Sequence, residues 1–176
     1  MGKINLVLYE PEIPQNTGNI MRTCVATNTV LHLIEPLGFS LGEKEIKRSG
    51  ANYIKDVEYI LYKNYDEFIE KNKGKGKMYY LSRYGVHSIH DLDVSNTDED
   101  YYFILGKEST GIPKQILHDN IDNCIRLPMT DKVRALNVSN VARLSCMKRY
   151  ANKVFLDYVN LNQKNLKERI TYQKIN

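Results

Sequence analysis

The residues of this chain that could do chemistry gather in three stretches, and the first runs from Tyr9 to Thr23 (YEPEIPQNTGNIMRT). Its prolines stiffen the approach to an expected helix, and Asn16 offers an amide group near the start of that helix. Arg22 follows one turn further on, and its guanidinium fork matches phosphate oxygens. The stretch therefore indicates a phosphate contact, while a surface salt bridge at Arg22 and a helix cap at Asn16 stay open as plainer interpretations.

The second stretch is Phe103–Pro113 (FILGKESTGIP). Gly106 and Gly111 mark a turn in which two backbone segments approach closely. The sequence GKEST is partly similar to a phosphate-binding P-loop. A P-loop requires a glycine five residues before its Gly-Lys pair and a serine or threonine directly after the lysine. Those positions hold Tyr101 and Glu108, so binding of a nucleoside triphosphate is not expected. From these residues alone, Glu108 is a solvated loop charge or a functional carboxylate.

The third stretch, Ile125–Asn140 (IRLPMTDKVRALNVSN), indicates a short buried strand, a loop of small and polar residues and the start of a long helix. Pro128 ends the strand, and Asn137, Ser139 or Asn140 can cap a helix that begins near Val138. A loop of this kind lies where ligands usually bind in an open α/β sheet. The stretch therefore predicts half of a cofactor site, with a well-capped core helix as the alternative.

These stretches must be positioned by a regular alternation of apolar segments along the chain. The expected strands are Ile4–Tyr9, Leu31–Ile34, Val57–Leu61, Met78–Leu81, Tyr102–Leu105 and Cys124–Leu127. The expected helices are Asn16–Thr27, Leu41–Arg48, Tyr65–Lys71, Pro113–Leu117 and the long one from Val138. Alternation of this kind predicts an α/β fold, with a mostly parallel sheet and helices on both of its faces.

The composition limits the classes of function. With 176 residues and 42% hydrophobic content, the chain is expected to form one domain over residues 1–159, followed by a basic, polar tail or helix extension over 160–176. The net charge of +4 and the pI near 8.8 permit an acidic partner such as RNA without demonstrating one. We find no apolar run near 18 residues and no secretory leader. A cytoplasmic protein without membrane association is therefore expected.

Cysteine and histidine spacing predicts neither a disulfide framework nor a metal site. The three cysteines, Cys24, Cys124 and Cys146, are an odd number without close pairing. They are expected to act as small buried hydrophobic residues. His87 and His90 lie three residues apart, but no thiolate or carboxylate set completes a zinc site. No metal cofactor is therefore expected.

Taken together, the three stretches resemble the three motifs of the SpoU branch of the SPOUT methyltransferases, in the order that this family uses. NTGN with a following arginine corresponds to the first motif, ILGKESTGIP to the second and IRLPMTDKVRALNVSN to the third. The segments LHLIEPLGF (Leu31–Phe39) and RSGANY (Arg48–Tyr53) are similar to those of the small tRNA wobble-nucleotide 2′-O-methyltransferases of the TrmL type. The resemblance extends from about Ile4 to about Tyr158.

The resemblance implies that the C-terminal segment threads through a loop to form a deep trefoil knot. It also implies that S-adenosylmethionine binds in the knot, with its adenine held by backbone groups of three loops, and leaves as S-adenosylhomocysteine. Carried over to this chain, the residues expected at the cofactor are Leu81, Gly106, Leu127, Met129 and Ala135. Relatives commonly have serine at the position of Ala135, so any duty of that hydroxyl is absent here.

The implied reaction is attack of a ribose 2′-hydroxyl, that of the wobble nucleotide (cytidine or uridine 34), on the methyl group of the cofactor. Arg22 occupies the position to which the family assigns a catalytic role. Because arginine is a poor general base, we expect Arg22 to grip the adjacent phosphate and to stabilise developing charge on the attacking oxygen. Asn16 and Asn137 are expected to orient the ribose or Arg22, and Glu108 to hold Arg22 or the amino acid end of the cofactor.

The implied partner is a tRNA anticodon stem-loop, bound by a homodimer that buries parts of the first and last helices. Positions on the last helix form a broad apolar arc for that interface: Val141, Met147, Tyr150, Val154 and Tyr158. We expect no RNA-binding domain before the first motif, so recognition falls to surface cations. Besides the basic tail, these are Lys44, Lys47, Arg48, Arg83, Lys132 and Arg134. Two alternatives stay open: 2′-O-methylation of another RNA such as ribosomal RNA, and a non-enzymatic RNA- or adenosine-binding module.

Overall fold

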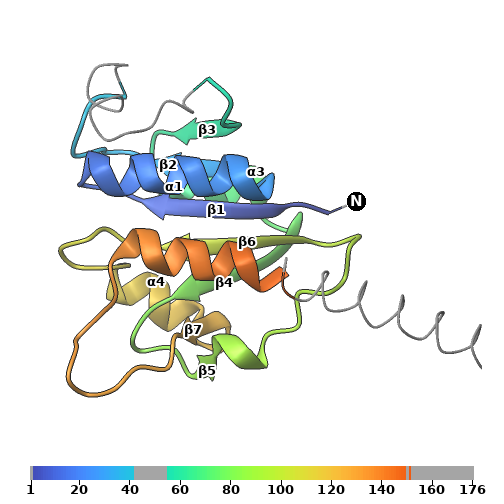
Figure 1. The fold of residues 1–176 in the computed structure, drawn as a ribbon, viewed down its shortest axis with the longest axis vertical. Helices are drawn as coiled ribbons and strands as arrows, with labels where there is room; N and C mark the ends of the chain where they lie inside the picture. The colour runs from blue at the N-terminus through green and yellow to red at the C-terminus, as the bar shows by residue number, and fades with distance from the viewer. Residues whose placement is uncertain (1, 42–54, 150, 152–176) are drawn as a thin grey trace, which may run out of the picture.

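The framework of the protein is a seven-stranded parallel sheet (Figure 1). The computed structural model describes residues 2–41, 55–149 and 151. Within these ranges the strands are β1 (Ile4–Tyr9), β2 (Val30–Ile34), β3 (Tyr59–Tyr62), β4 (Gly76–Leu81), β5 (His87–Ser88), β6 (Asp100–Leu105) and β7 (Cys124–Arg126). They pair in parallel in the order β3-β2-β1-β6-β4-β7-β5.

Helices cover both faces of this sheet, as predicted. On one face lie α1 (Pro14–Thr27) and a C-terminal helix whose described part spans residues 138–149; Figure 1 shows them in blue and orange. On the other face lie α3 (Tyr65–Asn72) and α4 (Lys114–Asp119). Two short 3₁₀ helices complete the described elements: η1 (Ile89–Asp91) directly follows β5, and η2 (Ile121–Asn123) directly precedes β7. Among the described helices, none is both long and apolar enough to cross a membrane.

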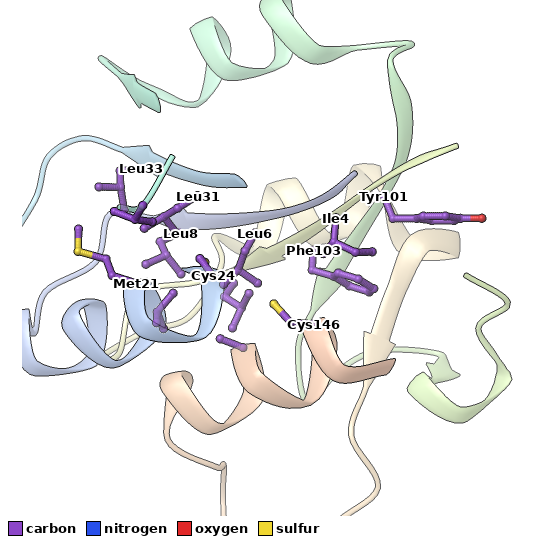
Figure 2. Packing of buried hydrophobic residues seen from close by; sticks show 14 of the residues in the cluster. Ile4, Leu6, Leu8, Met21, Cys24, Leu31, Leu33, Tyr101, Phe103 and Cys146 are labelled. Carbon is purple, nitrogen blue, oxygen red and sulfur yellow. The ribbon is translucent and has the colours of Figure 1, made fainter. Parts of the chain in front are cut away.

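The core is divided by the sheet into two apolar clusters. Along β1 the side chains of Leu6 and Leu8 enter the cluster under α1 and the C-terminal helix, while Val7 enters the opposite one. Figure 2 shows the first cluster, in which Cys24 of α1 and Cys146 of the C-terminal helix are both buried. Burial raises the pKa of Cys146 to about 11, so this thiol behaves as a hydrophobic group, as predicted.

The expected secondary structure is confirmed, with described boundaries that differ from the predicted ones by at most two residues. The structure adds β5, whose two residues are too few to show any periodicity. The expected helix Leu41–Arg48 lies, apart from Leu41, outside the described residues. The trefoil knot and the segment 160–176 stay predictions, since nothing after residue 151 is described.

Candidate functional site

The carboxyl ends of four neighbouring strands meet at one edge of the sheet. The register pairs Leu105 of β6 with Leu8 of β1 on one side and with Leu81 of β4 on the other, and Leu81 in turn with Ile125 of β7. In an open α/β sheet, ligands bind in the crevice outside this edge. Four loops emerge here, at the left of Figure 1: residues 10–13, 82–86, 106–112 and 127–137.

Three of the residues predicted to hold the cofactor lie at this edge. Leu81 ends β4, Gly106 directly follows β6, and Leu127 directly follows β7. Met129 and Ala135 lie further along the 127–137 loop, where both are exposed. Backbone groups at these adjacent strand ends, together with the apolar side chain of Leu81, fit a flat, weakly polar ring such as adenine. The donor set is therefore compatible with the predicted cofactor contacts.

The turn between Gly106 and Gly111 is as tight as the sequence predicted. A Cβ atom on Gly106 would lie 2.1 Å from the carbonyl carbon of Gly111 and 2.2 Å from the nitrogen of Ile112. Gly111 has a φ of +75°, and its N–H donates to the carbonyl of Lys107 at 2.8 Å. Glycine is required at both positions, at Gly106 by space and at Gly111 by conformation.

A chain of side-chain hydrogen bonds joins the three stretches that carry the predicted chemistry. Asn137 Nδ2 donates to Asn16 Oδ1 at 3.0 Å, and Asn16 Nδ2 donates to Glu108 Oε1 at 2.9 Å. The second carboxyl oxygen of Glu108 accepts from the backbone N–H of Glu12 at 2.9 Å. The bonded side chains are 121 and 92 positions apart in the sequence. Three of the four residues predicted for catalysis are thus brought together.

The two asparagines differ in their relation to the helices. Asn137 caps the C-terminal helix, because its Oδ1 accepts from the N–H of Ser139 at 2.8 Å and from the Ser139 hydroxyl at 2.7 Å. The cap interpretation is wrong for Asn16. Helix α1 begins at Pro14, which suits a first helical position since it has no N–H to leave unpaired. Asn16 is buried in the first turn, where its side chain bonds to the two other stretches.

Arg22 lies on the exposed side of α1. Arg22 stands about two turns after Pro14, the first residue of α1. The partial positive charge of a helix terminus falls off within about one turn. A phosphate bound at Arg22 would therefore gain most from the guanidinium itself, and the contact of Arg22 with a phosphate stays a prediction.

The sequence reasoning missed two carboxylates that connect the first stretch to the second. Lys107 Nζ lies 2.6 Å from Glu10 Oε2, and this carboxylate raises the pKa of Lys107. Glu12 accepts from the hydroxyl and from the N–H of Ser109, both at 2.8 Å, and these bonds lower its pKa. The sequence signal that could have revealed them was an acidic residue on each side of Pro11, directly after β1. Elsewhere in the described ranges, as here, no group of three or more His, Cys, Asp or Glu is placed to hold a metal.

An exposed arginine–tyrosine pair occupies the 82–86 loop. The guanidinium carbon of Arg83 lies 4.7 Å from the ring centre of Tyr84, and Arg83 donates to the Tyr84 hydroxyl. Gly85 fixes the loop, since a Cβ there would lie 2.3 Å from the carbonyl carbon of Ile125. Tyr84 was missed because one aromatic residue in a polar loop shows no periodicity. Among the other predicted RNA-binding cations, Lys132 and Arg134 are exposed on the 127–137 loop; Lys44, Lys47, Arg48 and the basic tail lie outside the described residues.

Comparison with known proteins agrees with this geometry. The model of the SpoU rRNA Methylase family matches residues 3–147. A Listeria monocytogenes protein, named as a candidate tRNA (cytidine(34)-2′-O)-methyltransferase, is 51% identical over 140 residues, which are 80% of this chain and 82% of the relative. A solved structure described as giving insights into the 2-OH methylation of C/U34 on tRNA is 33% identical, with a TM-score of 0.79 over 87% of this chain and 97% of that one.

A more distant solved structure shares the fold alone. It is the SpoU methyltransferase AviRb from Streptomyces viridochromogenes, in complex with the cofactor AdoMet. The two chains are 17% identical, with a TM-score of 0.72 over 86% of this chain and 58% of that one.

Proposed function

Because the chain belongs to the SpoU rRNA methylase family, we propose that it transfers a methyl group from S-adenosylmethionine to the ribose 2′-hydroxyl of the wobble nucleotide, cytidine or uridine 34, of a tRNA. The relative that is 51% identical and the solved structure that is 33% identical both carry names that refer to position 34 of tRNA. A tRNA substrate also implies a cytoplasmic location. The reaction needs a site that aligns the attacking oxygen with the methyl carbon and the sulfur.

The observation that carries the proposal is the hydrogen-bonded chain Asn137–Asn16–Glu108. Each member comes from a different one of the three stretches, and the chain lies at the edge where the strand ends Leu81 and Leu105 meet. Helix capping would use only the oxygen of Asn137, and it does not explain why the Asn137 amide bonds to Asn16. The arrangement gives a rigid set of polar groups beside the strand ends that are proposed to hold the cofactor.

Each predicted residue has a role in this proposal. S-Adenosylmethionine, when bound, supplies an electrophilic methyl group. The residues that would hold it are Leu81, Gly106, Leu127, Met129 and Ala135. Arg22 would bind the phosphate next to the reacting ribose and stabilise charge on its oxygen, as a guanidinium can without giving up a proton. Asn16 and Asn137 would orient the ribose, and the Glu108 carboxyl would keep Asn16 in place, since it accepts from the Asn16 amide.

RNA would be recognised by the exposed cations near this edge and by Tyr84. Single-stranded RNA loops are commonly bound by aromatic rings and arginine planes on which unstacked bases lie. Tyr84 is 55% exposed and carries the Arg83 guanidinium against its ring, which suits a base of the anticodon loop. Arg83, Lys132 and Arg134 would contact phosphates.

We further propose that the active species is a homodimer that uses the C-terminal helix. Leu144 and Met147 are 48% and 46% exposed on that helix, and Val133 and Leu136 are exposed on the loop before it. Exposed apolar side chains gathered in this way mark an interaction surface. Of the positions predicted from the sequence, Val141 packs against the core of its own protomer. Tyr150, Val154 and Tyr158 lie outside the described residues.

The test is incubation of the protein with methyl-labelled S-adenosylmethionine and total tRNA, followed by digestion and nucleoside mapping. Label in 2′-O-methylcytidine or 2′-O-methyluridine at position 34 is expected. Label only in ribosomal RNA offered in parallel would favour the second substrate class. Binding of S-adenosylmethionine without transfer to either RNA would instead identify a binding module. This alternative is worth testing because Ala135 lacks the serine hydroxyl that relatives commonly have.

A further inference from the structure

Three pairs of residues tie the segment after β1 to the turn after β6. Glu12 accepts through both of its carboxylate oxygens from Ser109, at 2.8 Å from the backbone nitrogen and 2.8 Å from the hydroxyl. In return, the backbone N–H of Glu12 donates to Glu108, the neighbour of Ser109. Lys107 and Glu10 add an ion pair of 2.6 Å. We call these contacts of residues 10 and 12 with residues 107–109 the clamp.

The backbone around Glu12 is also held in place by contacts with the segment after β2. Glu10 has a φ of +46°, a conformation that residues other than glycine rarely adopt, and its N–H donates to the carbonyl of Ile34 at 3.0 Å. Gly38 lies against the backbone of Glu12, where a Cβ would come within 2.7 Å of the Glu12 Cα, and its N–H donates to Pro11. The surroundings thus enforce a strained turn that aims two carboxylates at one partner loop.

The clamp joins two parts of the site that have different proposed roles, one in methyl transfer and one in cofactor binding. The segment that carries Glu12 continues within four residues into Asn16 and then into α1 with Arg22. The turn that carries Ser109 begins at Gly106, the proposed cofactor contact at the end of β6. The strand pairing of β1 with β6 ends at Leu8 and Leu105, directly before these two loops. Beyond the strand ends, the two segments are joined by contacts of their own, which are the clamp and the bond between Asn16 and Glu108.

We propose that Glu12 is a positioning residue for methyl transfer, which holds the Gly106–Gly111 turn in register with Asn16 and Arg22 through Ser109. This inference rests on the proposed function, and it adds a residue outside the set that the sequence motifs assigned to the reaction. A misplacement of about 1 Å between the cofactor and the group that it reacts with can lower a rate by about 100-fold. A contact that fixes this distance therefore acts on turnover.

The clamp depends on a charged carboxylate rather than on side-chain size. Ser109 offers Glu12 two donors, and a carboxylate can accept both. The amide of a Glu12→Gln variant has the same shape but no charge and only one acceptor oxygen, so the Ser109 hydroxyl would have to turn to accept from its NH₂ group, and the charge-assisted bonds are lost. The Glu99→Gln variant is the matched control, because Glu99 pairs with Lys77 at 2.9 Å near the amino-terminal ends of β4 and β6, away from the site.

The experiment measures kcat, KM for S-adenosylmethionine and thermal midpoint for the wild type, E12Q and E99Q. We expect E12Q to lower kcat about 10-fold, the scale of one lost charge-assisted hydrogen bond. KM for the cofactor and the thermal midpoint should stay close to wild type, since both loops remain folded. E99Q should match the wild type. Ser109→Ala should lower kcat about threefold alone and not at all in the E12Q background.

A second readout separates this inference from the proposed function. Hydrogen–deuterium exchange of the peptide covering residues 106–112 should be faster in E12Q than in the wild type or E99Q, whether or not any RNA is methylated. If exchange is unchanged, or if kcat falls only together with the thermal midpoint, the positioning role is overturned. If exchange responds but the wild type methylates no RNA, the clamp stands and the proposed function fails.

Discussion

At the scale of single residues, the site depends on two asparagine side chains that each donate one hydrogen bond and accept another. Asn16 donates to Glu108 and accepts from Asn137, while Asn137 donates to Asn16 and accepts from Ser139. An asparagine can do this because its oxygen is an acceptor and its nitrogen a donor. Aspartate would keep the acceptor and lose the donor. The pattern therefore selects asparagine at both positions for reasons that helix capping alone does not provide.

Arg22 is the residue whose removal should separate chemistry from cofactor binding. We expect Arg22→Ala to lower methyl transfer by about 100-fold, because a charge that stabilises the transition state is lost. Binding of S-adenosylmethionine, measured by calorimetry, should stay nearly unchanged. Arg22→Lys should recover only part of the rate, since lysine keeps the charge but not the fork that grips phosphate. Unchanged turnover of the alanine variant would remove Arg22 from the catalytic set.

At the scale of elements, the turn after β6 has no room for a side chain. Gly106→Ala would place a Cβ 2.1 Å from the backbone of Gly111, which should destabilise the protein by about 3 kcal/mol or weaken cofactor binding by moving the turn. Gly74→Ala is the control, because Gly74 has a positive φ of 82° but no atom within 4 Å of the added Cβ. It should cost only about 1 kcal/mol. Urea unfolding measures both, and equal losses would contradict the steric argument.

The pairing of β1, β2 and β3 contains a buried histidine that should make stability depend on pH. His32 lies between the Tyr62 hydroxyl, at 2.8 Å, and Asn5 Oδ1, at 3.1 Å, and burial lowers its pKa to about 4 from an ordinary 6.5. Between these values the unfolded chain binds a proton that the folded protein excludes. The free energy of unfolding should therefore have its full value above pH 6.5 and fall as the pH drops toward 4. The loss should be about 2 kcal/mol at pH 5.

Urea unfolding at pH 7 and pH 5 tests this dependence. The difference should shrink in a His32→Gln variant, which has no ring to protonate, and persist in His118→Gln, whose side chain is 85% exposed. An unaltered difference in His32→Gln would assign the pH dependence to other groups.

The sequence allowed the elements to be predicted more fully than their contacts. Apolar runs and helical periodicity depend on neighbours in the chain, so strands such as β1 and the start of the C-terminal helix could be placed. The site residues came from motif resemblance, and their bonds could not be foreseen, because whether Asn16 reaches Asn137 depends on strand order and register. Glu12 was missed for the same reason, because its bonds to Ser109 could not be foreseen from the sequence.

At the scale of the whole molecule, the exposed side of the C-terminal helix should control assembly. Met147→Asp should convert the proposed dimer into monomers in light scattering, because a carboxylate would be buried in an apolar interface. The protomer should keep its thermal midpoint, since Met147 is already 46% exposed. Methylation of tRNA should fall strongly in the monomer.

Ile121→Asp is the control for this prediction. Ile121 lies on η2, is 43% exposed, and should tolerate the charge without change in mass. A wild-type protein that is monomeric and fully active at assay concentration would contradict the proposed dimer.

The great sequence distances between bonded partners also have a consequence for synthesis. Asn16 leaves the ribosome early, but its donor lies 121 residues later and Glu108 lies 92 residues later. The sheet itself needs β6, which is inserted between β1 and β4 after both have been made. A nascent chain that ends before residue 137 thus carries most of the fold without a closed site. Activity should therefore appear only after residue 137 has been synthesised. A truncated product should methylate no RNA.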